Sequence, residues 1–242
     1  MEETLTPQQT AGPYRDRIIP AASLVSAPVA PYAKHYVFRL PDGDWVELPL
    51  LALPPDGLTA IVSLCITENS FDLEDRLSTA MAALARDLGA QVIVGMPTLG
   101  MVLAASVARK LGHPHYVPLS YSRKFWFDDA LCVPVRSITS PGSPKSVYLD
   151  PRIVDRLQGK RVVIVDDVIS TGTSMLAQLE LVRRAGVEVS GIVTAMQETR
   201  AWIDPIRRAR CDPFLQVRTV LRSPLFRRTA QGWLPDPQTL PD

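Results

Sequence analysis

The sequence predicts an α/β fold, in which a central parallel sheet is flanked by helices and accompanied by β-rich segments from both ends of the chain. Three observations predict it. Apolar runs of strand length alternate with amphipathic runs of helix length through the middle of the chain, as in parallel sheets with crossover helices. Only 7 of the 22 prolines fall in residues 61–200, so the middle is the regular part. The flanking segments show strand-like alternation instead.

Composition excludes several classes of protein. With 242 residues and 46% apolar side chains, the chain can bury a full core. A net charge of +1 gives no field that would make nucleic acid or an anionic membrane the main partner. The three cysteines show no CxxC spacing, which disfavours a zinc site or a disulfide framework. No basic region followed by an apolar run opens the sequence, and no apolar stretch is long enough to span a membrane, so we expect a soluble, cytoplasmic protein.

The elements follow in order. Residues 1–30 contain four prolines and are expected to be extended and partly disordered. Residues 31–200 are expected to form the main domain, which begins with a β-hairpin whose strand-like runs at 36–40 and 45–51 flank the turn sequence Pro41-Asp42-Gly43-Asp44. Three helices are then predicted to end at Gly89, Gly112 and Gly186. Apolar runs of strand length lie at 60–66, 92–94, 115–119, 161–165 and 187–196.

Two segments break this rhythm. Residues 120–147 contain three prolines and have no sustained period. A loop of that length inside a compact domain is usually functional or disordered. Residues 201–242 are expected to form a C-terminal tail, which alternates weakly near 215–220 and then forms a hairpin around Gln231 and Gly232.

The chemistry is concentrated in residues 161–174. A buried strand ends at two carboxylates, Asp166 and Asp167, and the next residues open a helix. Ligands bind outside the carboxyl ends of strands in open α/β sheets, and a helix N-terminus is a ready anion site. A helix cap would explain one hydroxyl, whereas four hydroxyl residues surround one glycine here, so we predict a phosphate site. They are Ser170, Thr171, Thr173 and Ser174, around Gly172.

The two carboxylates need a different partner. Adjacent side chains in a strand point to opposite faces, but at a strand end both can turn toward the crevice. Beside a phosphate site they would repel the ligand unless they accept protons from its hydroxyl groups or lie near a divalent cation. A sugar with vicinal hydroxyls meets this requirement. In the alternative reading, one aspartate is a cap and the other belongs to a salt bridge.

Residues 163–174 resemble the phosphoribosyl-pyrophosphate (PRPP) signature of type I phosphoribosyltransferases: an apolar run, two acids, three residues, Thr-Gly and a hydroxyl residue. The resemblance implies that Asp166 and Asp167 hold the ribose 2- and 3-hydroxyls and lie near a Mg²⁺ cofactor. It also implies that Ser170, Thr171, Gly172, Thr173 and Ser174 wrap the 5-phosphate. A Walker A loop is excluded, since no Gly-Lys-Ser/Thr follows the strand.

The resemblance extends to the neighbouring loops. The family binds pyrophosphate in the loop after the preceding strand, which here is Met96, Pro97, Thr98, Leu99 and Gly100. Residues 120–147 are similar to the family's mobile lid, in which Arg123 would contact pyrophosphate and Lys124 would act in catalysis. A variable β-rich hood from outside the central sheet covers the base in this family, and here the hairpin at 36–51 and the tail at 201–242 would form it. Trp202 and Phe38 are candidate base contacts, with ordinary packing as the alternative.

The function expected from the resemblance is Mg²⁺-dependent transfer of 5-phosphoribosyl from PRPP to a nitrogenous base in nucleotide metabolism, such as purine salvage, by a homodimer. Three departures leave the base open. Ser170 replaces the acid of the 6-oxopurine enzymes. The Lys-Glu-x-Lys-x-His-Gly-like lid of the orotate enzymes is absent, and so is the Glu-Ser-Arg-Gly-like loop of the adenine enzymes.

A second hypothesis is a PRPP-sensing regulator that binds nucleic acid through its arginine-rich tail. Such a protein would keep the acid pair and the phosphate loop but would need neither a lid nor a base pocket. The long segment 120–147 favours the enzyme, and the absence of a recognisable DNA-binding motif disfavours the regulator.

Overall fold

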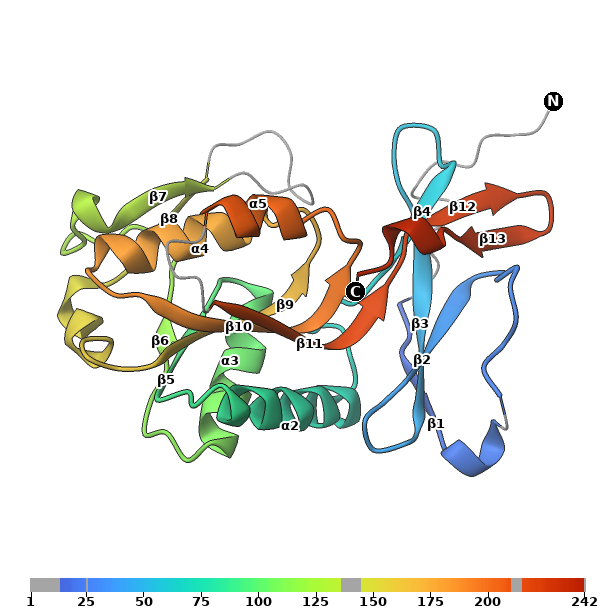
Figure 1. The fold of residues 1–242 in the computed structure, drawn as a ribbon, viewed down its shortest axis with the longest axis horizontal. Helices are drawn as coiled ribbons and strands as arrows, with labels where there is room; N and C mark the ends of the chain where they lie inside the picture. Colours follow the sequence, from blue (N-terminus) through green and yellow to red (C-terminus); the bar gives the residue numbers. More distant parts are fainter. Residues whose placement is uncertain (1–13, 25, 136–144, 210–214, 242) are drawn as a thin grey trace.

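The computed structural model describes residues 14–24, 26–135, 145–209 and 215–241. Within these residues the chain forms a five-stranded parallel sheet with helices on both faces and a six-stranded antiparallel sheet beside it (Figure 1). No helix in these ranges has the length and apolar character needed to cross a membrane. The architecture agrees with the fold class that the sequence predicts.

The parallel sheet has the strand order β11-β10-β9-β5-β6. Helices α2 (Phe71–Asp87) and α3 (Leu99–Lys110) cover one face, and α4 (Thr173–Arg184) and α5 (Ile203–Ala209) cover the other (Figure 1). Its strands are β5 (Val92–Gly95), β6 (Val117–Pro118), β9 (Val162–Ile169), β10 (Val189–Glu198) and β11 (Gln216–Ser223).

Strand β9 lies at the centre of this sheet and is buried on both faces. Val163 and Val165 belong to the hydrophobic cluster under α2 and α3, whereas Val162 and Ile164 belong to the cluster under α4. A strand buried on both sides reads as a continuous apolar run, which is why the sequence signal is strong here. Because all five strands are parallel, their carboxyl ends meet at one edge, and β10 and β11 point from there toward the antiparallel sheet (Figure 1).

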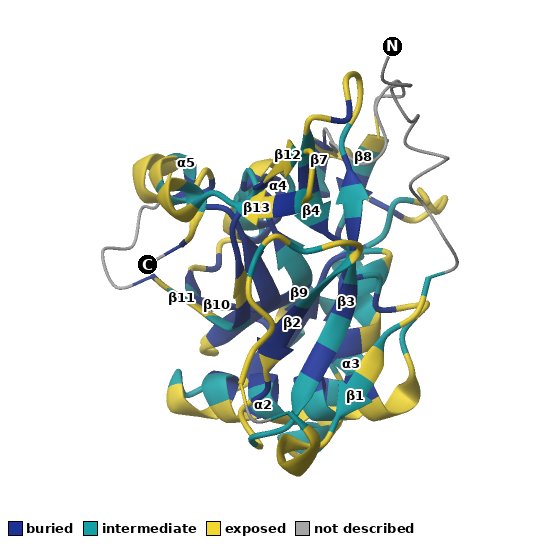
Figure 2. Ribbon diagram, turned by 90° about the vertical axis from the view of Figure 1, so that its right-hand side faces the viewer, coloured by how far each residue is buried: buried dark blue, intermediate teal, exposed yellow. Residues whose placement is uncertain are grey.

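The antiparallel sheet, called the hood below, joins the two ends of the chain. Both predicted hairpins are present, β2 with β3 and β12 with β13, and β12 also pairs with β4. Buried and half-buried residues alternate along β3, because one of its faces packs inward (Figure 2). The hood strands are β1 (Arg17–Ile19), β2 (His35–Arg39), β3 (Trp45–Ala52), β4 (Thr59–Val62), β12 (Phe226–Thr229) and β13 (Gly232–Pro235).

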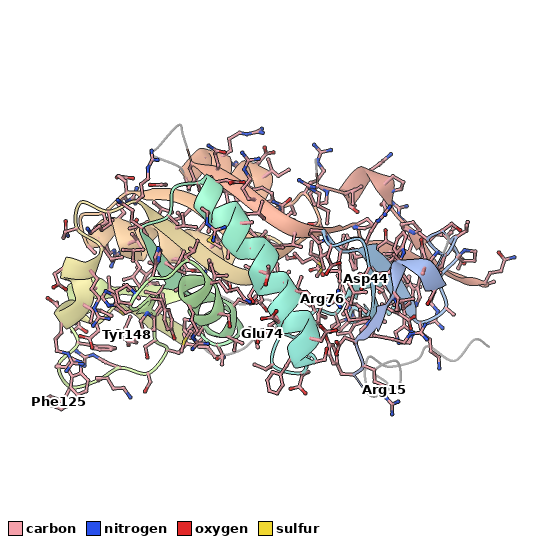
Figure 3. All side chains as sticks on the ribbon, turned by 90° about the horizontal axis from the view of Figure 1, so that it is seen from below. Arg15, Asp44, Glu74, Arg76, Phe125 and Tyr148 are labelled. Atoms are coloured by element: carbon pink, nitrogen blue, oxygen red, sulfur yellow. The ribbon has the colours of Figure 1, made fainter. Side chains whose placement is uncertain are left out.

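An ion cluster connects the hood to the parallel-sheet domain. Arg76 on α2 lies 2.7 Å from Asp42 and 3.1 Å from Asp44, both in the turn of the β2–β3 hairpin, and 2.9 Å from Asp72 on its own helix. Figure 3 shows Arg76 and Asp44 together where α2 meets the hood. One guanidinium that contacts three carboxylates makes a network, which stabilises more than an isolated surface pair.

Two parts of the structure differ from the sequence expectation. Strand β11 pairs in parallel with β10, so the chain after residue 200 is not all hood. It is an edge strand with several half-exposed residues, which weakens its apolar signal. Residues 120–147 are not uniformly irregular either. Strand β7 (Cys132–Val135) pairs with β8 (Lys145–Tyr148) across residues 136–144, which lie outside the described ranges.

Part of the expected N-terminal extension is ordered and packs against the start of α2. Short 3₁₀ helices complete the described chain. The Asp16 carboxylate accepts a hydrogen bond from the Ser70 amide at 3.0 Å, at the start of α2. Residues 1–13 of that segment are outside the described ranges. The 3₁₀ helices are η1 (Ala21–Ser23), η2 (Asp129–Leu131), η3 (Pro151–Arg156) and η4 (Pro237–Thr239).

Candidate functional site

The acid pair lies inside β9, because the strand continues past the predicted end at residue 165 to Ile169. Asp166 is 7% exposed. Its Oδ1 accepts a hydrogen bond from the Asp167 amide at 3.0 Å, and its Oδ2 accepts one from Nε2 of Gln178 on α4 at 2.9 Å. Both oxygens of Asp166 are therefore held by protein groups, while Asp167 is half-buried. The two aspartates are not equivalent.

The predicted pyrophosphate loop packs directly on this pair. A Cβ placed on Gly100 would lie 2.4 Å from Oδ1 of Asp166, so only glycine allows this approach. Helix α3 begins at Leu99, within this predicted loop, and the side chain of its N-cap residue, Thr98, makes no capping hydrogen bond. The Pro97–Thr98 peptide is cis. The amino end of α3, with its free N–H groups and positive dipole end, thus lies against the acid pair.

The predicted phosphate loop opens α4 on the other side of the pair. Gly172 is the N-cap residue, with φ +81° in the left-handed region, and no side chain caps the helix. The Thr171 and Thr173 hydroxyl oxygens are 3.1 Å apart. The alternative reading, in which one hydroxyl simply caps α4, is therefore not what the structure shows. The first amides of α4 therefore have no side-chain cap, which is a feature of helix N-termini that bind anions.

Burial dominates the electrostatics of the site. It raises the pKa of Asp166 well above the ordinary range, and the neighbouring Asp167 charge adds to this effect. Burial also raises the pKa of Asp167. On the loop after β6, the pKa of the Tyr121 phenol is raised by burial and by the charges of both aspartates. A ligand that offers hydroxyl protons or a cation would stabilise the charged form of this pair.

Glu198 is a site residue that sequence reasoning missed. It ends β10, is 5% exposed, and lies beside Ser170, because the residues just before them, Gln197 and Ile169, are paired in the sheet. Burial raises its pKa to about 7; the hydrogen bond from Ser170 opposes this rise and the Asp167 charge supports it. The available signal was a glutamate two residues beyond a predicted parallel strand, at the edge where ligands bind. Tyr121 was missed for a different reason, since it lies in the aperiodic segment.

Because the pKa of Glu198 is raised, we expect the free energy of unfolding to depend on pH. The folded state binds the Glu198 proton more tightly than the unfolded chain, in which the carboxyl has its ordinary pKa of 4.5. The stabilising contribution of this proton is therefore complete below pH 4.5 and is lost as the pH rises through about 7. At about 1.4 kcal/mol per tenfold change in proton affinity, the loss is roughly 3 kcal/mol. We expect Glu198→Gln to raise the free energy of urea unfolding by up to this amount at about pH 8 and by little at about pH 5. A difference that is the same at both pH values would contradict the assignment.

The remaining predicted residues are dispersed. Arg123 is exposed and pairs with Asp129 of its own loop at 2.8 Å, and Lys124 is exposed. Phe38 is buried in the hood, where its ring meets that of Tyr36 edge-on. Trp202 belongs to the hydrophobic cluster under α4, so the structure does not bring the two candidate base contacts together.

The chain is similar to known proteins of one family. A family model described as a phosphoribosyl transferase domain matches residues 72–211. An adenine phosphoribosyltransferase of Streptomyces coelicolor is 32% identical over 123 residues, which cover 50% of this chain and 63% of the relative. Another from Frankia casuarinae is 30% identical over 175 residues, which cover 72% of this chain and 88% of the relative. The chain spans less than two thirds of the length of the first curated relatives that it matches.

Solved structures show the same fold. An adenine phosphoribosyltransferase of Thermoanaerobacter pseudethanolicus aligns with a TM-score of 0.53 and 23% identity, over 72% of this chain and 94% of that one. The enzyme of Giardia lamblia complexed with 9-deazaadenine aligns with a TM-score of 0.54 and 17% identity, over 90% of this chain and 98% of that one.

Proposed function

The chain belongs to the phosphoribosyl transferase domain family, and from this premise we propose that it transfers 5-phosphoribosyl from PRPP to a nitrogenous base and releases pyrophosphate. One observation carries the proposal. Two helix N-termini without side-chain caps, those of α3 and α4, flank the acid pair at the carboxyl end of β9. This arrangement offers two anion sites on either side of groups that accept protons from sugar hydroxyls, which matches the two phosphate groups and the ribose of PRPP.

Each part of the site has a role in this proposal. The amides and hydroxyls of the phosphate loop hold the 5-phosphate, with about 1.5–3 kcal/mol for each charge-assisted hydrogen bond. Asp167 accepts hydrogen bonds from the ribose hydroxyls, and Asp166, held by Gln178, supports it. The loop from Met96 to Gly100 holds pyrophosphate. Arg123 would reach pyrophosphate only after leaving Asp129, so its contact and that of Lys124 belong to a closed state of the lid.

The donor set fits Mg²⁺ that is held in part by ligand oxygens. Among the described residues no group of three His, Cys, Asp or Glu side chains could hold a metal ion alone. The half-buried Asp167 offers a carboxylate, and Mg²⁺ usually keeps water and phosphate oxygens as its other ligands. When bound, Mg²⁺ neutralises charge on the leaving pyrophosphate.

The reaction displaces pyrophosphate from C1 of the ribose. A ring nitrogen forms a bond to C1 while the C1–oxygen bond breaks, and the nitrogen loses its proton. The transition state resembles an oxocarbenium ion, as in glycoside cleavage. This chain's residues contribute mainly by holding the ribose and both phosphate groups in line and by excluding water.

We propose adenine as the acceptor. The relatives cited above are named adenine phosphoribosyltransferases, and Ser170 stands where 6-oxopurine enzymes carry an acid. Trp202 remains a candidate base contact, because its buried indole Nε1 has no hydrogen-bond partner among the described residues. Phe38 is the weaker candidate, because its ring lies in an aromatic cluster of the hood.

The test is a pyrophosphate-release screen with PRPP and Mg²⁺ against adenine, 6-oxopurines, orotate and uracil. We expect release with adenine and little with the other bases. Activity with another base only would refute the acceptor and keep the reaction. If no base supports release and the protein instead binds duplex nucleic acid in a salt-sensitive way, the chain is a regulator and the transferase proposal is wrong.

A further inference from the structure

The turn that follows β10 lies against the phosphate loop. We propose that Glu198, Thr199 and Trp202, called the brace below, fix this loop in its anion-binding shape, and that Glu198 is a positioning residue for the 5-phosphate of PRPP. The inference rests on the proposed function for the identity of the ligand. The brace itself rests on three contacts, which involve loop positions 170 and 172.

The first contact is between Glu198 and Ser170. Ser170 and Glu198 follow directly after the paired residues Ile169 and Gln197 of β9 and β10, so the Ser170 side chain lies beside the buried Glu198 carboxyl and lowers its pKa. A buried carboxyl next to Asp167 is costly, and a glutamine or an apolar residue would fill the same space at lower cost. Residues that lower stability at the edge of a binding site usually have a functional role. Here the carboxyl fixes the side chain that begins the phosphate loop.

The second contact involves Thr199, whose backbone is in the left-handed region with φ +61°. A β-branched residue rarely adopts this conformation, and such strained residues gather at functional sites. Its amide donates to the Ser223 carbonyl at 2.9 Å, and its hydroxyl accepts from the Ala201 amide at 3.2 Å. The same hydroxyl donates toward the Ser170 carbonyl at 3.5 Å. The strained turn thus meets both the side chain and the backbone of Ser170.

The third contact is between Trp202 and Gly172. A Cβ on Gly172 would lie 3.3 Å from Cβ of Trp202 and 3.4 Å from Cγ1 of Ile206 on α5. Trp202 and α5 therefore pack against the left-handed N-cap of α4, whose amides are not capped by a side chain. Loop positions 170 and 172 are both held by residues that follow β10.

The experiment compares Glu198→Ala and Glu198→Gln with Glu188→Gln, an exposed glutamate just before the same strand. Loop exchange is measured as amide hydrogen exchange of Leu176, which donates to the loop carbonyl of Gly172 at 2.9 Å, on the full chain without ligand, and the KM for PRPP and kcat are measured separately. For Glu198→Ala we expect at least about tenfold faster loop exchange and about tenfold higher KM, with a smaller change in kcat. Glutamine can still accept the Ser170 hydroxyl, so Glu198→Gln should restore slow exchange, and the control should match wild type.

Loop exchange and KM within twofold of wild type in Glu198→Ala would overturn the brace. If that variant does not fold, Ser170→Ala removes the same side-chain contact from the other side, and unchanged exchange of the Leu176 amide would overturn the brace equally. Failure of the proposed function has a different signature. In that case wild type shows no base-dependent pyrophosphate release, whereas the exchange comparison still decides whether Glu198 orders the loop.

Discussion

Replacing Asp166 and Asp167 together by asparagine abolishes pyrophosphate release from PRPP while the protein stays folded. Asparagine keeps the shape of each side chain but removes the charge that accepts ribose hydroxyl protons and attracts a cation. Losing one such electrostatic contact in an active site typically costs about 10²- to 10³-fold in rate, so we expect a loss of at least roughly a thousandfold. Pyrophosphate release is the measurement, and turnover within tenfold of wild type would remove the mechanism.

The double variant should lose activity but keep or gain stability. Burial raises the pKa of both aspartates, so the folded state disfavours their charged forms. Neutral asparagines remove this cost, and we expect an unfolding midpoint at neutral pH equal to or higher than that of wild type. A loss of activity caused by unfolding is thereby distinguished from a loss of chemistry.

The single variants should differ. Both oxygens of Asp166 already accept hydrogen bonds within the protein, whereas Asp167 is the more exposed member of the pair. Gln178 can turn its amide so that its unpartnered Oε1 accepts from an asparagine at position 166. We therefore expect Asp167→Asn to lose more activity than Asp166→Asn. The reverse order would show that Asp166 turns toward the ligand.

The sequence revealed the parts of the site that are contiguous. The acids and the hydroxyl loop lie within nine residues, 166–174, and their chemistry follows from a strand end joined to a helix start. Glu198 and Tyr121 reach the same place from other strands, so only the sheet order brings them together. The place of strand β11 in the parallel sheet was not predicted, because an edge strand is half-exposed and its apolar pattern is weak. The β7–β8 pair was hidden because its strands are short and their register depends on packing against α4.

Gly100 illustrates what no local pattern could reveal. A glycine near the start of a helix reads as a weak helix former, and replacing it by alanine would normally stabilise the helix by about 0.5–1 kcal/mol. In the structure it is the point at which α3 touches the acid pair. The added Cβ would lie 2.4 Å from Oδ1 of Asp166 and 3.1 Å from its Cα. The second atom belongs to the backbone of a central strand and cannot move aside, so the start of α3 must shift.

We expect Gly100→Ala to reduce the rate of pyrophosphate release by roughly a hundredfold, because a displacement of about 1 Å in a positioning group has an effect of this size. Overpacking should also lower the free energy of unfolding by about 1–3 kcal/mol. Gly112→Ala at the other end of α3 is the matched control. Its φ of +77° makes alanine costly by about 1–2 kcal/mol, yet nothing lies within 4 Å of the added Cβ.

The two variants should therefore lose similar stability in denaturant unfolding, and only Gly100→Ala should lose activity per folded molecule. Equal activities would mean that the pyrophosphate loop does not depend on its contact with Asp166. In that case the amino end of α3 would be a structural neighbour of the acid pair rather than the second anion site, and the phosphate loop at α4 would be left to hold the ligand alone.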